Sequence, residues 1–336
     1  GTGAAIGNIA IGAHAMDGTT SNAQTGTIAI GHEALTALTT GARNTAVGYQ
    51  ASKVLTTGVD NTSLGYTALD ELVDGSGNTA IGSYALGDMV GGTTSDGSSN
   101  NTALGYNAAG GTWADQDCSN LVAIGAGSLA GALAGDTADG SVAVGRSALT
   151  ALTSGAGNTA VGYESLKTAA TESQTVALGY QSMAIALPGS NGVFIGYKAG
   201  YDFSQGGDNN VAIGHESMSG THGGGSEKNT AVGSGTMAGA INAAARNTAV
   251  GYDAGAAITT ATDNVLLGSN SGDSITTANK CTFIGNSAGT AVTVTGGSNV
   301  SDGSVGIGYQ ALTALTSGAG NTAVGYTAGA EEVAGN

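Results

Sequence analysis

The side chains best suited to chemistry in this sequence are four histidines and a set of acidic residues in glycine-rich turns. His32 and His215 each follow a recurring glycine and precede a glutamate, as His32-Glu33 and His215-Glu216. A histidine beside a carboxylate is suited to general acid–base catalysis. No serine or cysteine nucleophile pattern accompanies these pairs, and they recur because the segment around them recurs. We therefore expect His14, His32 and His215 to be repeat positions, and we expect no enzyme.

The acidic turns offer a second kind of chemistry, because carboxylate oxygens are the ligands that Ca²⁺ prefers. Their spacing does not follow the GGxGxD register of calcium-binding β-rolls. We therefore expect no cofactor, with calcium in these turns as the open alternative. The aspartates concerned are Asp74, Asp96, Asp139, Asp208 and Asp302.

The two cysteines, Cys118 and Cys281, lie in no CxxC or histidine-rich setting, so a zinc or redox site is not expected. The interval between them is the same one that relates two nearly identical segments, 141–166 and 304–329. In a stack of short coils this interval separates the thiols by far more than the Cα distance of about 7 Å that a disulfide allows. We predict that they are not bridged.

The charge of the chain excludes several partners. Lys plus Arg number 8 against 24 Asp plus Glu, which gives a net charge of −16. Binding to nucleic acid needs clustered cations, and an anionic membrane surface repels such a chain. No apolar run approaches the length of about 18 residues that indicates a membrane span. We expect neither nucleic-acid binding nor membrane insertion.

An internal repeat accounts for almost the whole sequence. The unit is N-[T/V]-A-[V/I/L]-G-Y-x-[A/S]-[L/M/G], and 17 intervals separate its 18 glycines. Nine intervals have a length of 17, and the lengths of the others run from 18 to 23. Repeats at such a period indicate a solenoid. The repeat glycines are Gly12, Gly31, Gly48, Gly65, Gly82, Gly105, Gly125, Gly145, Gly162, Gly179, Gly196, Gly214, Gly233, Gly251, Gly268, Gly285, Gly308 and Gly325.

The positions around each glycine are strictly filled. The residue before it is Val, Ile or Leu in all 18 copies, and the residue three before it is always β-branched. Two before it, 13 copies have Ala; four before it, 11 have Asn; one after it, nine have Tyr. This alternation is typical of a β-strand. A second apolar run, clearest as ALTALT, follows the glycine, so we predict two strands and two turns per coil.

The predicted fold is all-β: a parallel β-solenoid of about 18 coils of 17–23 residues, continuous over residues 1–336. We expect the β-branched and aliphatic positions to face inward as a core ladder. We expect the alanines to face outward, where an uncharged strip would pack copies of the chain together, three copies being preferred over a monomer. The core ladder is Val47, Leu64, Ile81, Val161, Leu178, Val250 and Val324, and the packing strip is Ala46, Ala80, Ala160, Ala249 and Ala323.

The segments GARNTAVGYQAS, GAGNTAVGYESL and GSVAVGRSAL resemble the head repeats of YadA-type trimeric autotransporter adhesins, and more closely the NTAVGYxAL repeats of phage tail-fibre proteins. The resemblance runs from about residue 6 to residue 329. It implies a left-handed parallel β-roll assembled as a homotrimer. The coils are longer than those of the adhesin heads, which favours the fibre proteins. The repeat is still running at Val324, which suggests an excerpt of a longer fibre.

We therefore expect an extracellular structural and adhesive segment, part of a phage tail fibre that presents a host-recognition tip on the virion. A bacterial surface adhesin or filament is the alternative, and an ice-binding solenoid is a third possibility, disfavoured because its Thr column is expected to face inward. The expected partners are further copies of the chain and a host-surface glycan or protein receptor. Aromatic side chains outside the Tyr column are candidate receptor contacts: Trp113, Tyr201 and Phe203.

Overall fold

The computed structural model describes residues 6–18, 24–87, 97–112, 117–133, 138–186, 189, 191–203, 207–290, 302–315 and 318–331. The chain forms two compact units, Gly1–Gln174 (unit 1) and Thr175–Asn336 (unit 2). Each unit is an all-β parallel β-solenoid, so the predicted fold class is confirmed at this level.

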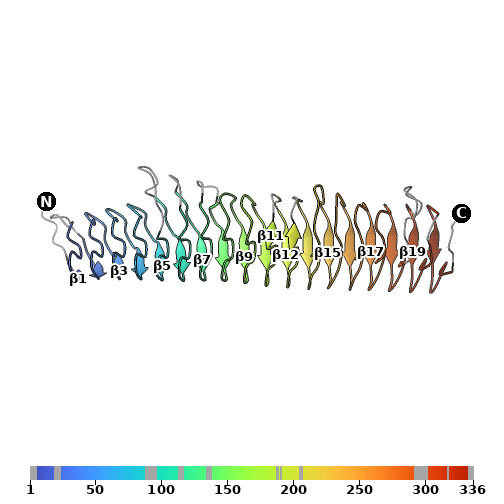
Figure 1. Cartoon of the computed structure of the whole chain (residues 1–336), viewed down its shortest axis with the longest axis horizontal. Coiled ribbons are helices and arrows are strands. Elements are labelled where there is room, and N and C mark those ends of the chain that lie inside the picture. The colour runs from blue at the N-terminus through green and yellow to red at the C-terminus, as the bar shows by residue number, and fades with distance from the viewer. Residues whose placement is uncertain are drawn as a thin grey trace. The chain divides into compact units, whose positions relative to one another are not determined.

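In the described part of unit 1, one three-residue strand from each repeat pairs with the strand of the next repeat, in parallel and in register. Figure 1 shows these strands as arrows that follow one another in chain order. The strands are β1 (Ile9–Ile11), β2 (Ile28–Ile30), β3 (Thr45–Val47), β4 (Thr62–Leu64), β5 (Thr79–Ile81), β6 (Thr102–Leu104), β7 (Val122–Ile124), β8 (Val142–Val144) and β9 (Thr159–Val161).

Unit 2 repeats this arrangement and adds one small sheet. Its main strands are β10 (Val176–Leu178), β12 (Val193–Ile195), β14 (Val211–Ile213), β15 (Thr230–Val232), β16 (Thr248–Val250), β17 (Val265–Leu267), β18 (Thr282–Ile284), β19 (Val305–Ile307) and β20 (Thr322–Val324). They too pair in parallel and in register. The small sheet pairs β11 (Ile185–Ala186) with β13 (Asp202–Phe203).

The repeat glycines fix how closely successive coils approach. A Cβ built on Gly48 would lie 2.1 Å from the carbonyl oxygen of Gly65, and most other repeat glycines face the next one in the same way. Their φ angles lie between +128° and +148°, a region that side chains rarely adopt. Glycine is therefore needed here both for conformation and for space.

The predicted directions of the strand side chains are wrong. From β2 to β19, the central residue of each main strand faces the interior: Ala46, Ala80, Ala160 and Ala249 are fully buried, and Ala323 in β20 is partly buried. The first and third residues face outward instead. Of the expected core-ladder residues, Val47, Ile81 and Leu178 are half-buried, whereas Leu64, Val161, Val250 and Val324 are exposed.

The physical reason is the narrow interior of a short coil. Alanine leaves room for leucines that enter from the turns, and Leu35, Leu38, Leu149 and Leu152 are all fully buried. β-Branched residues favour strands whether or not their side chains are buried, so they occupy the outer positions. The core therefore consists of central strand residues, turn leucines and the asparagine column.

The predicted second strand is also wrong for the described part of the ALTALT segments, where residues 34–37, 148–151 and 311–314 form turns. Leu35 and Leu149 adopt left-handed φ angles of 52° and 51°, which turn their side chains into the interior. These turns still bond to the next coil, since Leu35 N donates to Ala51 O at 3.1 Å. The β11–β13 pair is the described segment where a second strand does form after the repeat glycine.

The asparagines four positions before the repeat glycines form buried amide ladders. Asn44 Oδ1 accepts hydrogen bonds from the backbone N–H of Asn61 at 2.9 Å and from its Nδ2 at 3.1 Å. Asn61 Nδ2 also donates to Gly75 O at 2.8 Å, and Asn78 N in turn donates to Asn61 Oδ1. Each amide thus joins adjacent coils and satisfies a turn carbonyl, which is what buried polar groups require.

Candidate functional surface

The largest feature available for contacts is the outward strand face, formed by the first and third residues of the main strands in each unit. It consists of Thr, Val, Ile and Leu only. Leu64 is 47% exposed, Leu104 44% and Val250 38%. Because the strands are in register, like side chains lie above one another and form continuous aliphatic and threonine columns.

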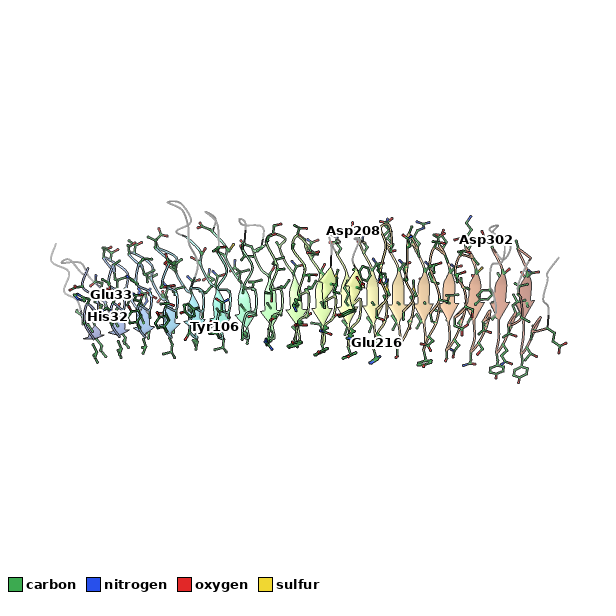
Figure 2. All side chains as sticks on the ribbon, in the orientation of Figure 1. His32, Glu33, Tyr106, Asp208, Glu216 and Asp302 are labelled. Carbon is green, nitrogen blue, oxygen red and sulfur yellow. The ribbon has the colours of Figure 1, made fainter. Side chains whose placement is uncertain are left out.

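A second feature is the aromatic edge, the column of aromatic residues directly after the repeat glycines or, for Tyr84, one position later. In unit 1, the His32 and Tyr49 rings stack with centroids 5.3 Å apart, and those of Tyr49 and Tyr66 at 5.2 Å, with interplanar angles of 8° and 7°. Tyr66–Tyr84 and Tyr84–Tyr106 continue the series edge to face. Figure 2 shows His32 and Tyr106 along the same edge of unit 1.

Unit 2 carries the same edge in two stretches. Tyr180 stacks on Tyr197 at 5.4 Å and Tyr197 on His215 at 5.0 Å, while Tyr309 stacks on Tyr326 at 5.2 Å. Within these stacks the ring faces cover one another. The exposed parts are therefore ring edges and phenol oxygens, an arrangement less suited to stacking on sugar rings.

The histidine–glutamate pairs lie on this edge as repeat positions. His215 Nδ1 is 3.8 Å from Glu216 Oε2, and both side chains are exposed. Glu33 contacts Gln50 and Lys53 of the next coil at 2.7 and 3.0 Å. The hydrogen bond with Gln50, and to a smaller extent the contact with Lys53, lowers the pKa of the Glu33 carboxyl. The pairs thus belong to a solvated polar surface. No pocket opens on the described surface.

The opposite edge carries the acidic turns, and Figure 2 shows Asp208 and Asp302 there, away from Glu216. Two of these aspartates hold backbone N–H groups of the preceding coil: Asp139 Oδ1 accepts from Ser119 N at 2.8 Å and Asp302 Oδ1 from Asn279 N at 2.7 Å. Ser76 and Ser99 do the same with their hydroxyls. Within the described ranges, no cluster of three metal-ligating side chains is found. Asp96 lies outside these ranges.

Two arginines on this turn edge form paired contacts with the next coil. Arg43 Nε and Nη2 donate to the two carboxylate oxygens of Asp60 at 2.6 and 2.7 Å. Arg246 makes the same pair with Asp263 at 2.6 and 3.0 Å. All four residues have φ angles near 60°. Bonding to arginine lowers the pKa of both aspartates, although these exposed pairs contribute little stability.

The three expected receptor contacts have different outcomes. Phe203 is fully buried, so a receptor-contact role for it is wrong. Tyr201 is half-buried and lies 5.0 Å from Lys198 Nζ, measured to its ring centroid. Trp113 lies outside the described residues. Tyr201 and Trp113 therefore stay predictions.

An aromatic cluster in the core of unit 2 was missed by the sequence reasoning. Phe203 contacts Phe194 edge to face at 5.1 Å and stacks on His222 at 4.0 Å with an interplanar angle of 8°. His222 Nδ1 donates to Asp202 O at 3.2 Å. Burial lowers the pKa of His222 to about 4, so its imidazole is neutral at pH 7. The sequence feature that could have predicted this cluster is Phe194, which stands where most strands have a central alanine.

The other buried titratable groups occupy structural positions in the stacked coils. Cys281 occupies the asparagine column, where its N–H donates to Asn264 Oδ1 at 2.8 Å, and burial raises its thiol pKa to about 11. Cys118 is also buried, but stands in a turn where its carbonyl accepts from Asn101 Nδ2. The two cysteines therefore hold different positions within their coils. Burial also raises the pKa of Glu172.

Comparison with known proteins adds no assignment: neither a protein-family model nor a curated protein matches this sequence. Within the residues that the structure describes, no helix has the length and apolar character needed to cross a bilayer.

Proposed function

We propose that this chain is a structural segment of a homotrimeric extracellular fibre, a viral tail fibre that presents a host-recognition tip. The observation that carries the proposal is the outward strand face. An apolar, charge-free strip on a chain of net charge −16 is typical of a contact surface. The resemblance of the NTAVGYxAL repeats to tail-fibre repeats supports this assignment and implies a left-handed roll.

The structure changes which residues would pack between chains. The alanines are inside, so copies would meet through the aliphatic columns, with Leu64, Leu104 and Val161 against their equivalents. Threonines beside them keep the face uncharged while adding hydroxyls that other chains can bond. The chain then has a structural rather than a catalytic role: its ladders resist bending, and its turns offer repeated receptor contacts.

Sedimentation equilibrium tests the assembly, with three times the chain mass as the expected result. The variant Leu64→Lys places a charge on the outward strand face and should shift the mass toward the monomer. Thr57→Lys, at an exposed turn position shortly before it in the sequence, adds the same charge and should leave the mass unchanged. A monomeric wild-type chain would refute the trimer. Immunogold labelling of virions, with gold on the tail, tests the location.

The outward threonines favour a second candidate, an ice-binding surface. Thr45, Thr62, Thr79 and Thr102 lie in register on consecutive strands and face outward, which removes the reason for disfavouring this function. A flat array of this kind would present regularly spaced methyl and hydroxyl groups. Measurement of thermal hysteresis decides: ice binding requires a hysteresis gap that Thr62→Lys abolishes. The trimer proposal expects none, since the same face is covered.

A further inference from the structure

The aromatic edge brings pairs of tyrosines into a repeated, nearly parallel arrangement. The Tyr49–Tyr66, Tyr180–Tyr197 and Tyr309–Tyr326 centroids are 5.2, 5.4 and 5.2 Å apart, with interplanar angles of 7°, 9° and 12°. Each pair joins equivalent positions of consecutive coils, directly after the repeat glycine.

The backbone holds each pair in the same way. On the Tyr49–Tyr66 pair, Gly65 N donates to Val47 O at 2.9 Å and Thr67 N donates to Tyr49 O at 2.9 Å. Corresponding bonds flank the other two pairs at 2.8 to 2.9 Å. The two Cα atoms are thus fixed one strand spacing apart, about 4.8 Å, and the rings share one direction.

The paired rings are also open to solvent. Tyr49, Tyr66, Tyr180 and Tyr197 are between 42% and 47% exposed, and Tyr309 is 43% exposed. Both phenols of a pair can therefore be oxidised from the solvent side, and the stack holds the two rings side by side with centroids 5.2 to 5.4 Å apart.

We propose that these three pairs are sites of dityrosine formation, which would join consecutive coils covalently. The oxidant is hydrogen peroxide acting through a peroxidase. Each phenol loses one electron and one proton, and the two phenoxyl radicals combine through the carbons ortho to oxygen. The two ring hydrogens at the new C–C bond then move to the oxygens, which restores both phenols. Hydrogen peroxide takes up the two electrons and two protons and leaves as two water molecules.

The neighbouring tyrosines provide an internal comparison. Tyr84 lies one position later in its coil than the other tyrosines, so it meets Tyr66 at 63° and Tyr106 at 81°. The pKa of the Tyr84 phenol is raised, mainly by burial and further by contact with Tyr66 and Tyr106. Because the Tyr84 ring departs from the parallel arrangement of the three pairs, we expect Tyr84 to couple poorly.

The test treats the full chain with horseradish peroxidase and hydrogen peroxide, then maps cross-linked peptides by mass spectrometry. We expect peptides joined as Tyr49–Tyr66, Tyr180–Tyr197 and Tyr309–Tyr326, each lighter by two hydrogen atoms, and a raised melting temperature because each link closes a loop. Intrachain links leave the chain at its own mass on a denaturing gel, whereas links between chains produce larger bands.

Two matched triple variants sharpen the result. Tyr49→Phe, Tyr180→Phe and Tyr309→Phe together keep the stacks but remove one phenol of each pair, so intrachain dityrosine fluorescence should fall to background. The variant Tyr84→Phe, Tyr201→Phe and Tyr252→Phe removes as many phenols and should retain the full signal, because Tyr252 has a serine at the same position of both adjacent coils. Equal losses in both variants, or dityrosine found only in bands of joined chains, would overturn the proposal. Circular dichroism checks that both variants keep the fold.

Discussion

Single residues set the spacing of the stack, and the repeat glycines show this most directly. We expect Gly48→Ala to destabilise the chain by more than about 3 kcal/mol, because the new Cβ would lie 2.1 Å from Gly65 O and the coils would have to separate. Thermal denaturation would show a lower melting temperature, and hydrogen exchange would show lost protection at β3 and β4.

Gly140→Ala separates the effect of conformation from the effect of space. Gly140 has a φ of 70°, but nothing lies within 4 Å of a Cβ built on it. The left-handed conformation alone costs an alanine about 1 to 2 kcal/mol. If both variants lost the same stability, close approach of the coils would not be the reason for the repeat glycine.

His222 makes stability depend on pH at one position. Its folded-state pKa is about 4 against an ordinary value of 6.5, so the unfolded chain binds more protons between these values. Stability is therefore complete above pH 6.5 and is lost as pH falls toward 4. Between pH 7 and pH 5 the loss should be on the order of 2 kcal/mol.

The comparison with His222→Phe isolates this contribution, because phenylalanine keeps the stack on Phe203 but does not titrate. As the pH falls from 7 to 5, the melting temperature of the wild type should fall relative to that of the variant. Other groups titrate equally in both chains and cancel. A difference that stays constant with pH would contradict the assigned role of the buried imidazole.

At the scale of the element, the side-chain volume of the central strand residue is matched to that of a residue in the following turn. Nine of the 18 coils pair a central alanine with a turn leucine or methionine four positions after the repeat glycine, as Ala160 does with Leu166. Where Phe194 or Phe283 replaces alanine, the turn residue is Gly200 or Gly289. A Cβ on Gly200 would lie 2.2 Å from Phe194 Cδ1, so volume is exchanged within the coil.

A double-mutant cycle tests this exchange. Phe194→Ala should cost about 3 to 5 kcal/mol through the cavity it leaves, and Gly200→Leu should destabilise by overpacking. The double variant recreates the common alanine–leucine pairing, and Leu166 shows that a leucine adopts the required left-handed φ. We expect the double variant to be more stable than either single variant in urea denaturation. Additive losses would show that the two positions do not share one space.

The same balance explains what the sequence could and could not predict. The parallel in-register stack follows from the repeat, because like residues recur at a fixed interval around a strand pattern. The direction of the strand side chains does not, because a three-residue strand with apolar residues on both faces fits either orientation. The volume of the interior determines this direction, because a turn leucine such as Leu149 fits inside the coil only opposite a small residue such as Ala143. The glycine that accompanies each phenylalanine was the signal for this.

Of the candidate surface, the sequence predicted the tyrosine column but not the orientation of its rings. Phe203 and Tyr201 looked alike as aromatics in a long turn, yet Phe203 belongs to a strand and is buried against Phe194. That difference arises from the β11–β13 pairing, which joins segments of consecutive coils and has no local signature.

At the scale of the whole molecule, charge and apolar surface act against each other. With 24 acidic and 8 basic residues, copies of the chain repel one another, while the outward strand face favours their association. Salt screens the repulsion over about 10 Å at 0.1 M but leaves apolar contact intact.

Raising sodium chloride from about 0.02 M to about 0.5 M should therefore tighten the proposed trimer. Sedimentation equilibrium would show this as a lower dissociation constant. Leu64→Lys should keep a weaker association at every salt concentration, because its added charge lies on the contact face. An assembly held by ion pairs between chains would instead come apart as salt is added, and that result would exclude the outward strand face as its main contact.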